Sequence, residues 1–204
     1  MGRHDITLSR SGSRTALAAG LYAPTPVLTA FGWQVLSDLV PGDLVVTRDH
    51  GLTPIAAIRP EIRPALWSVH LPPGAMGNGT AVTLPPGQPI LVESRFALPF
   101  CGETSALVPA MALEGWRGIA PHVPARTEPI LQLLLSRPGI LFAGPGLLTA
   151  APGIEATFDL MQLLRPPTHP VLPLAAARQL VASLIAAEAG HGLLQAALLP
   201  PNLS

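Results

Sequence analysis

The chain has 204 residues, of which 49% are hydrophobic and only 12% are charged. This length suits one principal domain with a core of real size. Twelve basic residues balance twelve acidic ones, so the chain has no net positive charge that would attract nucleic acid or anionic lipid. We therefore expect no nucleic-acid partner. A surface so poor in charge is prone to association, since a typical domain has about 25% charged residues. Composition therefore favours a protein partner and leaves the oligomeric state open.

The proline content limits the length of the predicted helices and strands. The chain contains 25 prolines, about 12% against a usual ~5%, which excludes long helices from most of its length and favours short strands joined by tight turns. The high apolar content argues against disorder as the explanation of so much proline and glycine. Cys101 is the only cysteine, which excludes an intrachain disulfide and a cysteine metal cluster.

The N-terminal segment imitates a signal peptide, because three arginines precede an apolar run at residues 15–23. That run only just reaches the ~7–15 apolar residues that a secretory signal requires, and Gly20 interrupts it. We therefore interpret residues 1–20 as a tail, which favours a cytoplasmic location over secretion. No stretch has the ~18 unbroken apolar residues of a membrane-spanning helix.

The stretch Gly32–Gly51 encodes a complete local unit. A polar turn, Val40–Asp43, leads into a strand rich in β-formers, Leu44–Thr47, and a second turn at Asp49–Gly51 ends that strand. Pro-Gly-Asp before a strand suits a type II turn, so we expect Gly42 at positive φ and the Asp43 carboxylate bonded to local backbone amides.

Three further β features follow along the chain. Residues 74–79 contain Gly77-Asn78-Gly79, which suits a hairpin turn better than a phosphate loop. Ile130–Leu135 and Gly139–Ala143 are apolar on both faces, as buried strands are. These patterns predict a mainly β domain.

The character of the sequence changes after Pro173. Residues 174–189 are Ala-rich without proline or internal glycine, which predicts a helix that ends at Gly190. One helical face would carry Leu174, Ala177, Val181, Leu184 and Ile185. A shorter helix over residues 191–199 would complete a hairpin. We expect this hairpin to cover an open side of the β core; the alternative is a docking surface for a partner.

The stretch Gly32–Gly51, together with Pro73–Gly79, Leu84–Pro86 and Leu107–Ala110 in the same order, resembles the Hint domain family of the bacterial type. Hint domains are the self-processing modules of Hedgehog proteins and inteins. The resemblance covers about residues 21–153. It implies a compact, mainly β fold of the Hint type with Pro26–Thr29 as its first strand.

We accordingly expect three parts: an N-terminal tail at residues 1–20, a Hint-like β domain at 21–165, and a C-terminal helical hairpin at 166–204 that packs on the β domain. The boundary falls in the proline-rich run at 165–170.

The resemblance also implies a catalytic set. A family member would use a cysteine to attack the preceding carbonyl and form a thioester, while a histidine in a Thr-x-x-His motif protonates the departing amide nitrogen. In this chain Leu21 stands at the nucleophile position. Pro85 and Gln88 replace the hydroxyl residue and the histidine of that motif, and Pro138 replaces a second histidine. Glutamine donates hydrogen bonds but delivers no proton.

Other residues offer little replacement chemistry. Thr25 is followed by proline and has no neighbouring base, so we interpret it as a strand-edge residue. Asp49 and His50 look like half a catalytic triad but suit a turn directly. We expect Cys101 to be a small buried residue. Asn202 near the end lacks the histidine that an intein's terminal asparagine would have before it.

The four histidines that follow His50 in the sequence do not form a metal motif. They are widely spaced, each beside apolar or proline residues, with no helical i, i+4 pair and no acidic residue at ligand spacing: His70, His122, His169 and His191. We expect no metal and no other cofactor. The sequence thus favours a catalytically silent Hint-like domain that serves as a structural or interaction module, not an enzyme. The alternative is a self-processing domain with altered catalytic residues.

Overall fold

A computed structural model describes residues 17–62, 65–123, 128–154, 169 and 171–198. The first strands are β1 Leu21–Tyr22, β2 Pro26–Thr29, β3 Gly32–Val35, β4 Leu44–Thr47, β5 Gly51–Pro60, β6 Ser68–Leu71 and β7 Val82–Leu84. Those that follow are β8 Pro89–Glu93, β9 Ser105–Pro109, β10 Ala120–His122, β11 Ile130–Leu135, β12 Gly139–Phe142 and β13 Leu148–Ala151. The helices are α1 Leu98–Cys101, α3 Leu174–Leu198 and the 3-10 turns η1 Leu36–Asp38, η2 Arg95–Ala97 and η3 Ala110–Leu113.

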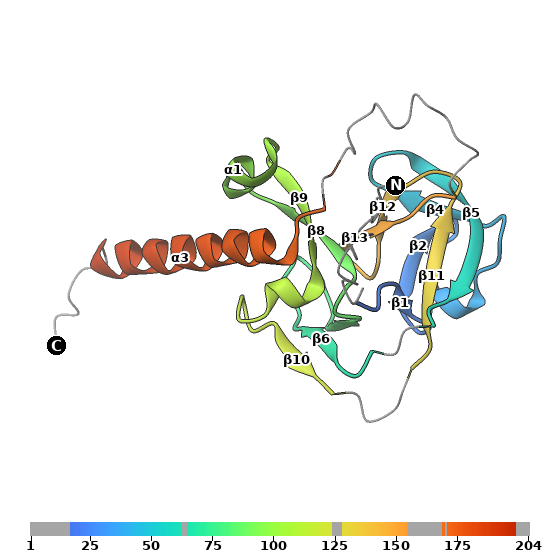
Figure 1. The fold of residues 1–204 in the computed structure, drawn as a ribbon, viewed down its shortest axis with the longest axis horizontal. Helices are drawn as coiled ribbons and strands as arrows, with labels where there is room; N and C mark the ends of the chain where they lie inside the picture. The colour runs from blue at the N-terminus through green and yellow to red at the C-terminus, as the bar shows by residue number, and fades with distance from the viewer. Residues whose placement is uncertain (1–16, 63–64, 124–127, 155–168, 170, 199–204) are drawn as a thin grey trace, which may run out of the picture.

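The fold is mainly β, as the sequence predicts. The larger sheet has the strand order β1-β11-β5-β4-β12-β13-β8-β9, and the β2–β3 hairpin joins it through β4. A smaller sheet has the order β10-β6-β7. Figure 1 shows the strands gathered in one body from which α3 extends to one side.

The predicted signature unit is confirmed. β4 has the predicted bounds, and Gly42 has a φ of 100°. The Asp43 amide donates to the Val40 carbonyl over 3.1 Å, and the Asp43 carboxylate accepts a 2.9 Å hydrogen bond from the Val40 amide. These contacts are those of a type II turn, which needs a residue at positive φ in its third position.

The downstream strands are also confirmed, with one correction. β11 has the predicted bounds, and β12 ends one residue earlier than predicted. The turn around Asn78 connects β6 to β7, and the Asn78 side chain closes it by accepting from the Met76 amide and donating to the Pro72 and Thr80 carbonyls. Pro26–Thr29 is not the first strand, because β1 precedes it and pairs with β11.

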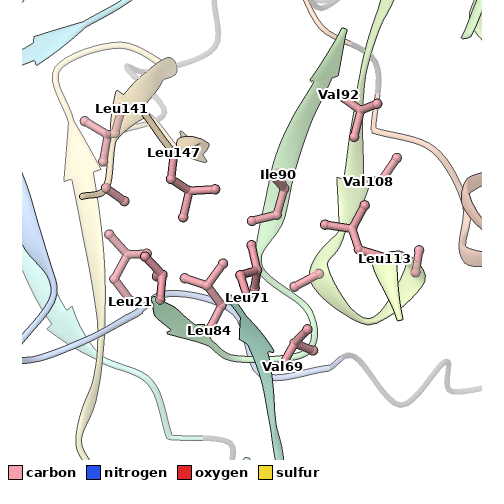
Figure 2. Packing of buried hydrophobic residues seen from close by; sticks show 14 of the residues in the cluster. Leu21, Val69, Leu71, Leu84, Ile90, Val92, Val108, Leu113, Leu141 and Leu147 are labelled. Atoms are coloured by element: carbon pink, nitrogen blue, oxygen red, sulfur yellow. The ribbon is translucent and has the colours of Figure 1, made fainter. Parts of the chain in front are cut away.

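One large hydrophobic cluster joins the two sheets. Leu71 and Leu84 of the smaller sheet lie beside Leu21 of β1, and Ile90 of β8 completes this part of the core (Figure 2). All four side chains are buried. β1 is therefore held by core packing as well as by its pairing with β11.

The predicted helical hairpin is wrong: α3 is a single helix that continues through Gly190 to Leu198. Glycine inside a helix costs only about 1 kcal/mol relative to alanine, and Gly190 does not adopt the positive φ of a helix stop. The predicted packing face is confirmed for Ala177, Val181 and Leu184, which are buried against η2, η3 and β9, whereas Ile185 is exposed. Among the described residues, no helix is long and apolar enough to span a membrane.

Candidate functional site

A mainly apolar cleft of about 400 Å³ lies where β1 enters the β body. Its walls contain three of the four positions that the resemblance marks, Leu21, Gln88 and Pro138. The other lining residues are Ala19, Gly20, Pro89, Leu107, Leu131, Gln132, Leu133, Leu141, Ala150, Ala151, Pro152, His169 and Val171. The fold thus brings together segments that are widely separated in the sequence.

The turn after β7 forms two hydrogen bonds with the segment before β1. The Gly87 amide donates to the Ala18 carbonyl over 2.9 Å, and the Gly20 amide donates to Gln88 Oε1 over 2.7 Å. Gly20 has a φ of 136°, and a Cβ at this position would lie 2.7 Å from the Leu131 carbonyl oxygen. Glycine is therefore required in front of Leu21 for both conformational and steric reasons.

The Gln88 side chain forms hydrogen bonds through its Oε1 and through both of its N–H groups. Besides accepting from Gly20, its Nε2 donates to Thr149 Oγ1 over 2.7 Å and to the Ala150 carbonyl over 2.9 Å. Thr149 in turn donates its own hydroxyl to the Pro89 carbonyl at 2.7 Å. A glutamine amide has two N–H donors, and here both are occupied. Gln88 ties the entry of β1 to β13.

Leu21 is 3% exposed and belongs to the main hydrophobic cluster. Its backbone pairs with Leu131 of β11. Figure 2 places its side chain near Leu84, and it lines the cleft together with Leu141. The position that the resemblance marks for the nucleophile is therefore an apolar core side chain.

The two prolines differ in their placement. Pro85 is buried, does not line the cleft, and starts the turn in which its carbonyl accepts from the Gln88 amide at 3.1 Å. Pro138 is exposed at the cleft, and His50 Nε2 lies 3.2 Å from its carbonyl oxygen. Neither proline carries a group that exchanges protons.

Two residues of the site were not predicted from the sequence to belong to it. His169 lines the cleft, and its Nδ1 lies 3.2 Å from the hydroxyl of Ser105 on β9. The short run at residues 169–172, which resembles the family loosely, was the available signal for it. Thr149 lies in an unremarkable strand sequence, and no local pattern marks it as the partner of Gln88.

The other predicted candidates have structural contacts. Thr25 is buried between β1 and β2, where its amide donates to Tyr22 and its carbonyl accepts from Leu36. Asp49 Oδ1 accepts from the Ile140 amide at 3.1 Å, and the His50 amide donates to Thr47 Oγ1, so this pair braces the turn between β4 and β5.

The expectation for Cys101 is only partly right, because its thiol is half-buried at the end of α1, 3.4 Å from the Ala97 carbonyl. Although the histidines are widely spaced in the sequence, the fold brings the rings of His70 and His122 to a centroid distance of 6.2 Å across β6 and β10. Within the described ranges no cluster of three or more His, Cys, Asp or Glu side chains could hold a metal ion. Asn202 and the domain boundary at 165–166 lie outside the described residues.

In this mainly β body the buried first strand enters a cleft beside the turns after β7 and β11. The chain belongs to the Hint domain family, whose sequence pattern matches residues 19–149.

Solved structures of this class are similar to the chain at low sequence identity. The bacterial intein-like domain from Clostridium thermocellum is 14% identical with a TM-score of 0.49, and the match covers 65% of this chain and 98% of that domain. The Msm DnaB1 intein splicing domain bound with zinc is 17% identical with a TM-score of 0.41, covering 64% and 98% of the two chains. The MchDnaB-1 intein is 14% identical with a TM-score of 0.38 and the same coverage. No curated protein matches the sequence.

Proposed function

We propose that residues 21–165 form a catalytically silent Hint-like domain that serves as a structural or protein-interaction module. The observation that carries this proposal is the environment of Leu21. Covalent acyl transfer needs a nucleophilic atom beside the preceding carbonyl. Leu21 offers only methyl groups, and its side chain is 3% exposed in the main core.

The state of Gln88 supports the same proposal. A general acid must deliver a proton to the departing nitrogen in the transition state. Gln88 has no titratable proton, and both of its N–H groups already bind Thr149 and Ala150. Its Oε1 accepts a hydrogen bond from the Gly20 amide and so holds the segment before β1 without supplying a proton.

The alternative, self-processing with altered residues, requires another nucleophile at the cleft. Among the described side chains that line it, none has a thiol, hydroxyl, amine or carboxylate, and the titratable group among them is the imidazole of His169. The Thr149 hydroxyl touches Gln88 but is fully buried and already donates to Pro89. Ser105 reaches the cleft only through its contact with His169. The silent domain is therefore the better supported of the two functions.

Intact-mass spectrometry tests the proposal. We expect the purified chain to keep its full-length mass during incubation with hydroxylamine or dithiothreitol, which intercept acyl intermediates. The variants Gln88→Ala and Thr25→Ala should behave identically. A time-dependent fragment with a new N-terminus near Leu21 or Thr25 would overturn the proposal, and its loss in one variant would identify the residue responsible.

A further inference from the structure

Two histidine side chains lie together on the smaller sheet, outside the cleft around Leu21. Strand β10 pairs antiparallel with β6, with Ala120 opposite His70 and His122 opposite Ser68. This register makes His70 and His122 diagonal neighbours on one face of the sheet, because residues two apart along a strand share a face. Their ring centroids are 6.2 Å apart, and the ring planes are inclined by 50°.

The face that carries this histidine pair is turned away from the hydrophobic core. Val69 and Leu71, which alternate with His70 along β6, are fully buried in the main cluster. His70 is half-buried and His122 is exposed. A small ligand from solvent can therefore reach the pair, while the packed core behind β6 holds the backbone that carries His70 in place.

Both imidazoles have ring nitrogens that no protein group engages. In the part of the chain that the structure describes, no hydrogen bond involves the ring of His70 or His122. The rings of His50 and His169, in contrast, both contact a protein oxygen. A neutral imidazole has one nitrogen that accepts, and this nitrogen is the commonest protein ligand for metal ions. The pair thus offers two ligand atoms from adjacent strands.

The spacing of the two rings suits one shared metal ion after a small movement. Zn–N bonds of about 2.0–2.1 Å in a tetrahedral arrangement place two imidazole centroids roughly 5 Å apart. The observed separation of 6.2 Å has to shrink by about 1 Å to reach this value. Rotation of the exposed His122 side chain can supply that movement, since exposed side chains change rotamer rapidly.

The surroundings of His122 favour a cation. This residue lines a cleft of about 280 Å³ that also contains Glu128, and no lysine or arginine is among the described residues of its wall. The Glu128 carboxylate attracts a positive ion without a competing positive charge nearby. The described residues contain no third His, Cys, Asp or Glu that completes a ligand set, so water occupies the other coordination positions.

We propose that His70 and His122 bind a divalent late first-row transition metal ion such as Zn²⁺. Nitrogen ligands select this class, because imidazole suits Zn, Cu and Ni, whereas Mg²⁺ and Ca²⁺ require oxygen ligands. The bound ion links β10 to β6 at the edge of the smaller sheet. Local spacing in the sequence does not reveal the pair, because the two histidines lie on separate strands.

Calorimetric titration of the untagged full chain with ZnCl₂ at about pH 7.5 tests the proposal. We expect a saturable zinc site with which excess Mg²⁺ does not compete. His70→Asn and His122→Asn should each weaken binding at least ~10-fold, because linking two ligands raises the apparent affinity by roughly 10²–10⁴. His50→Asn is the matched control and should bind zinc as the wild type does.

Melting temperatures measured without zinc will show that the variants are folded, and the exposed position of His122 keeps the test decisive if the His70 variant folds poorly. Zinc should raise the melting temperature of the wild type, since it binds the native state. Absence of saturable zinc binding overturns the proposal, as does a zinc site that survives His122→Asn. An equal loss in His50→Asn also overturns it. None of these outcomes changes the mass that tests catalytic silence.

Discussion

The indole N–H of Trp116 donates to Glu188 Oε2 over 3.0 Å and so fastens α3 to the loop after η3. Arg117 Nε donates to the other carboxylate oxygen at 2.9 Å, and its guanidinium lies 4.6 Å from the Trp116 ring centroid. Leu174 and Glu188 are separated by about 21 Å of helix, at 1.5 Å per residue. The contact therefore sits far from the start of α3 and restrains its direction.

The Glu188 contact predicts a pH dependence. The hydrogen bond from Arg117 lowers the pKa of Glu188 below its ordinary 4.5, with a further lowering by Trp116. A lowered folded-state pKa stabilises the fold above 4.5, and this stabilisation is lost as the pH falls through the folded value. Glu188→Gln should reduce the melting temperature slightly at about pH 7, and the difference should vanish at low pH. A difference that is constant with pH contradicts this explanation.

Glu114 predicts the opposite dependence. Burial raises its pKa above 4.5, only partly offset by Arg178, and its Oε1 is buried without a hydrogen-bond partner in the described structure. A raised folded-state pKa gives relative stability below 4.5 that is lost as the pH rises through the folded value. Glu114→Gln should raise the melting temperature at about pH 7 and have little effect near pH 4. Glu103→Gln, the same substitution at an exposed position, is the matched control.

Leu184 tests whether α3 is part of the core. Its side chain is 8% exposed and belongs to the main cluster, so Leu184→Ala should cost about 2–5 kcal/mol through lost burial and the remaining cavity. The neighbouring Ile185 is 39% exposed, and Ile185→Ala should cost much less. Chemical denaturation measures both. Equal effects would mean that α3 contributes little through this face.

Gly42 tests the turn before β4. Its φ is 100°, and a Cβ there would meet no atom within 4 Å, so the cost of substitution is backbone strain alone. Gly42→Val should destabilise by about 1 kcal/mol or more. Gly42→Asn should cost less, because asparagine tolerates positive φ. Thermal unfolding of the two variants compares them, and an unchanged melting temperature for the valine variant would refute the prediction.

Elements that depend on local chemistry could be read from the sequence. The Pro-Gly-Asp turn and β4 are fixed by neighbouring residues, since Asp43 binds the amide of Val40 within the same turn. The buried face of α3 is likewise visible in the spacing of Ala177, Val181 and Leu184. In these segments the pattern and the observed structure agree.

Features that depend on contacts between residues far apart in the sequence could not be predicted from it. β1 has two residues, too few to show a pattern, and only pairing with β11 makes it a strand. The bond between Gly20 and Gln88 joins residues separated by 68 positions. His169 enters the cleft because the chain returns past β9, a contact that the loose family resemblance of residues 169–172 does not specify. The end of α3 was misplaced because Gly190 breaks a helix only weakly.

The placement of β1 has a consequence for how the chain folds. Leu21 can pair only after β11 has formed, and the Gly20 amide finds its acceptor only after the turn carrying Gln88 is in position. Contacts between distant segments form slowly, because loop closure costs entropy before the contacts repay it. We therefore expect the amides of Gly20 and Leu21 to gain protection from hydrogen exchange late in refolding, after those of β4 and β5.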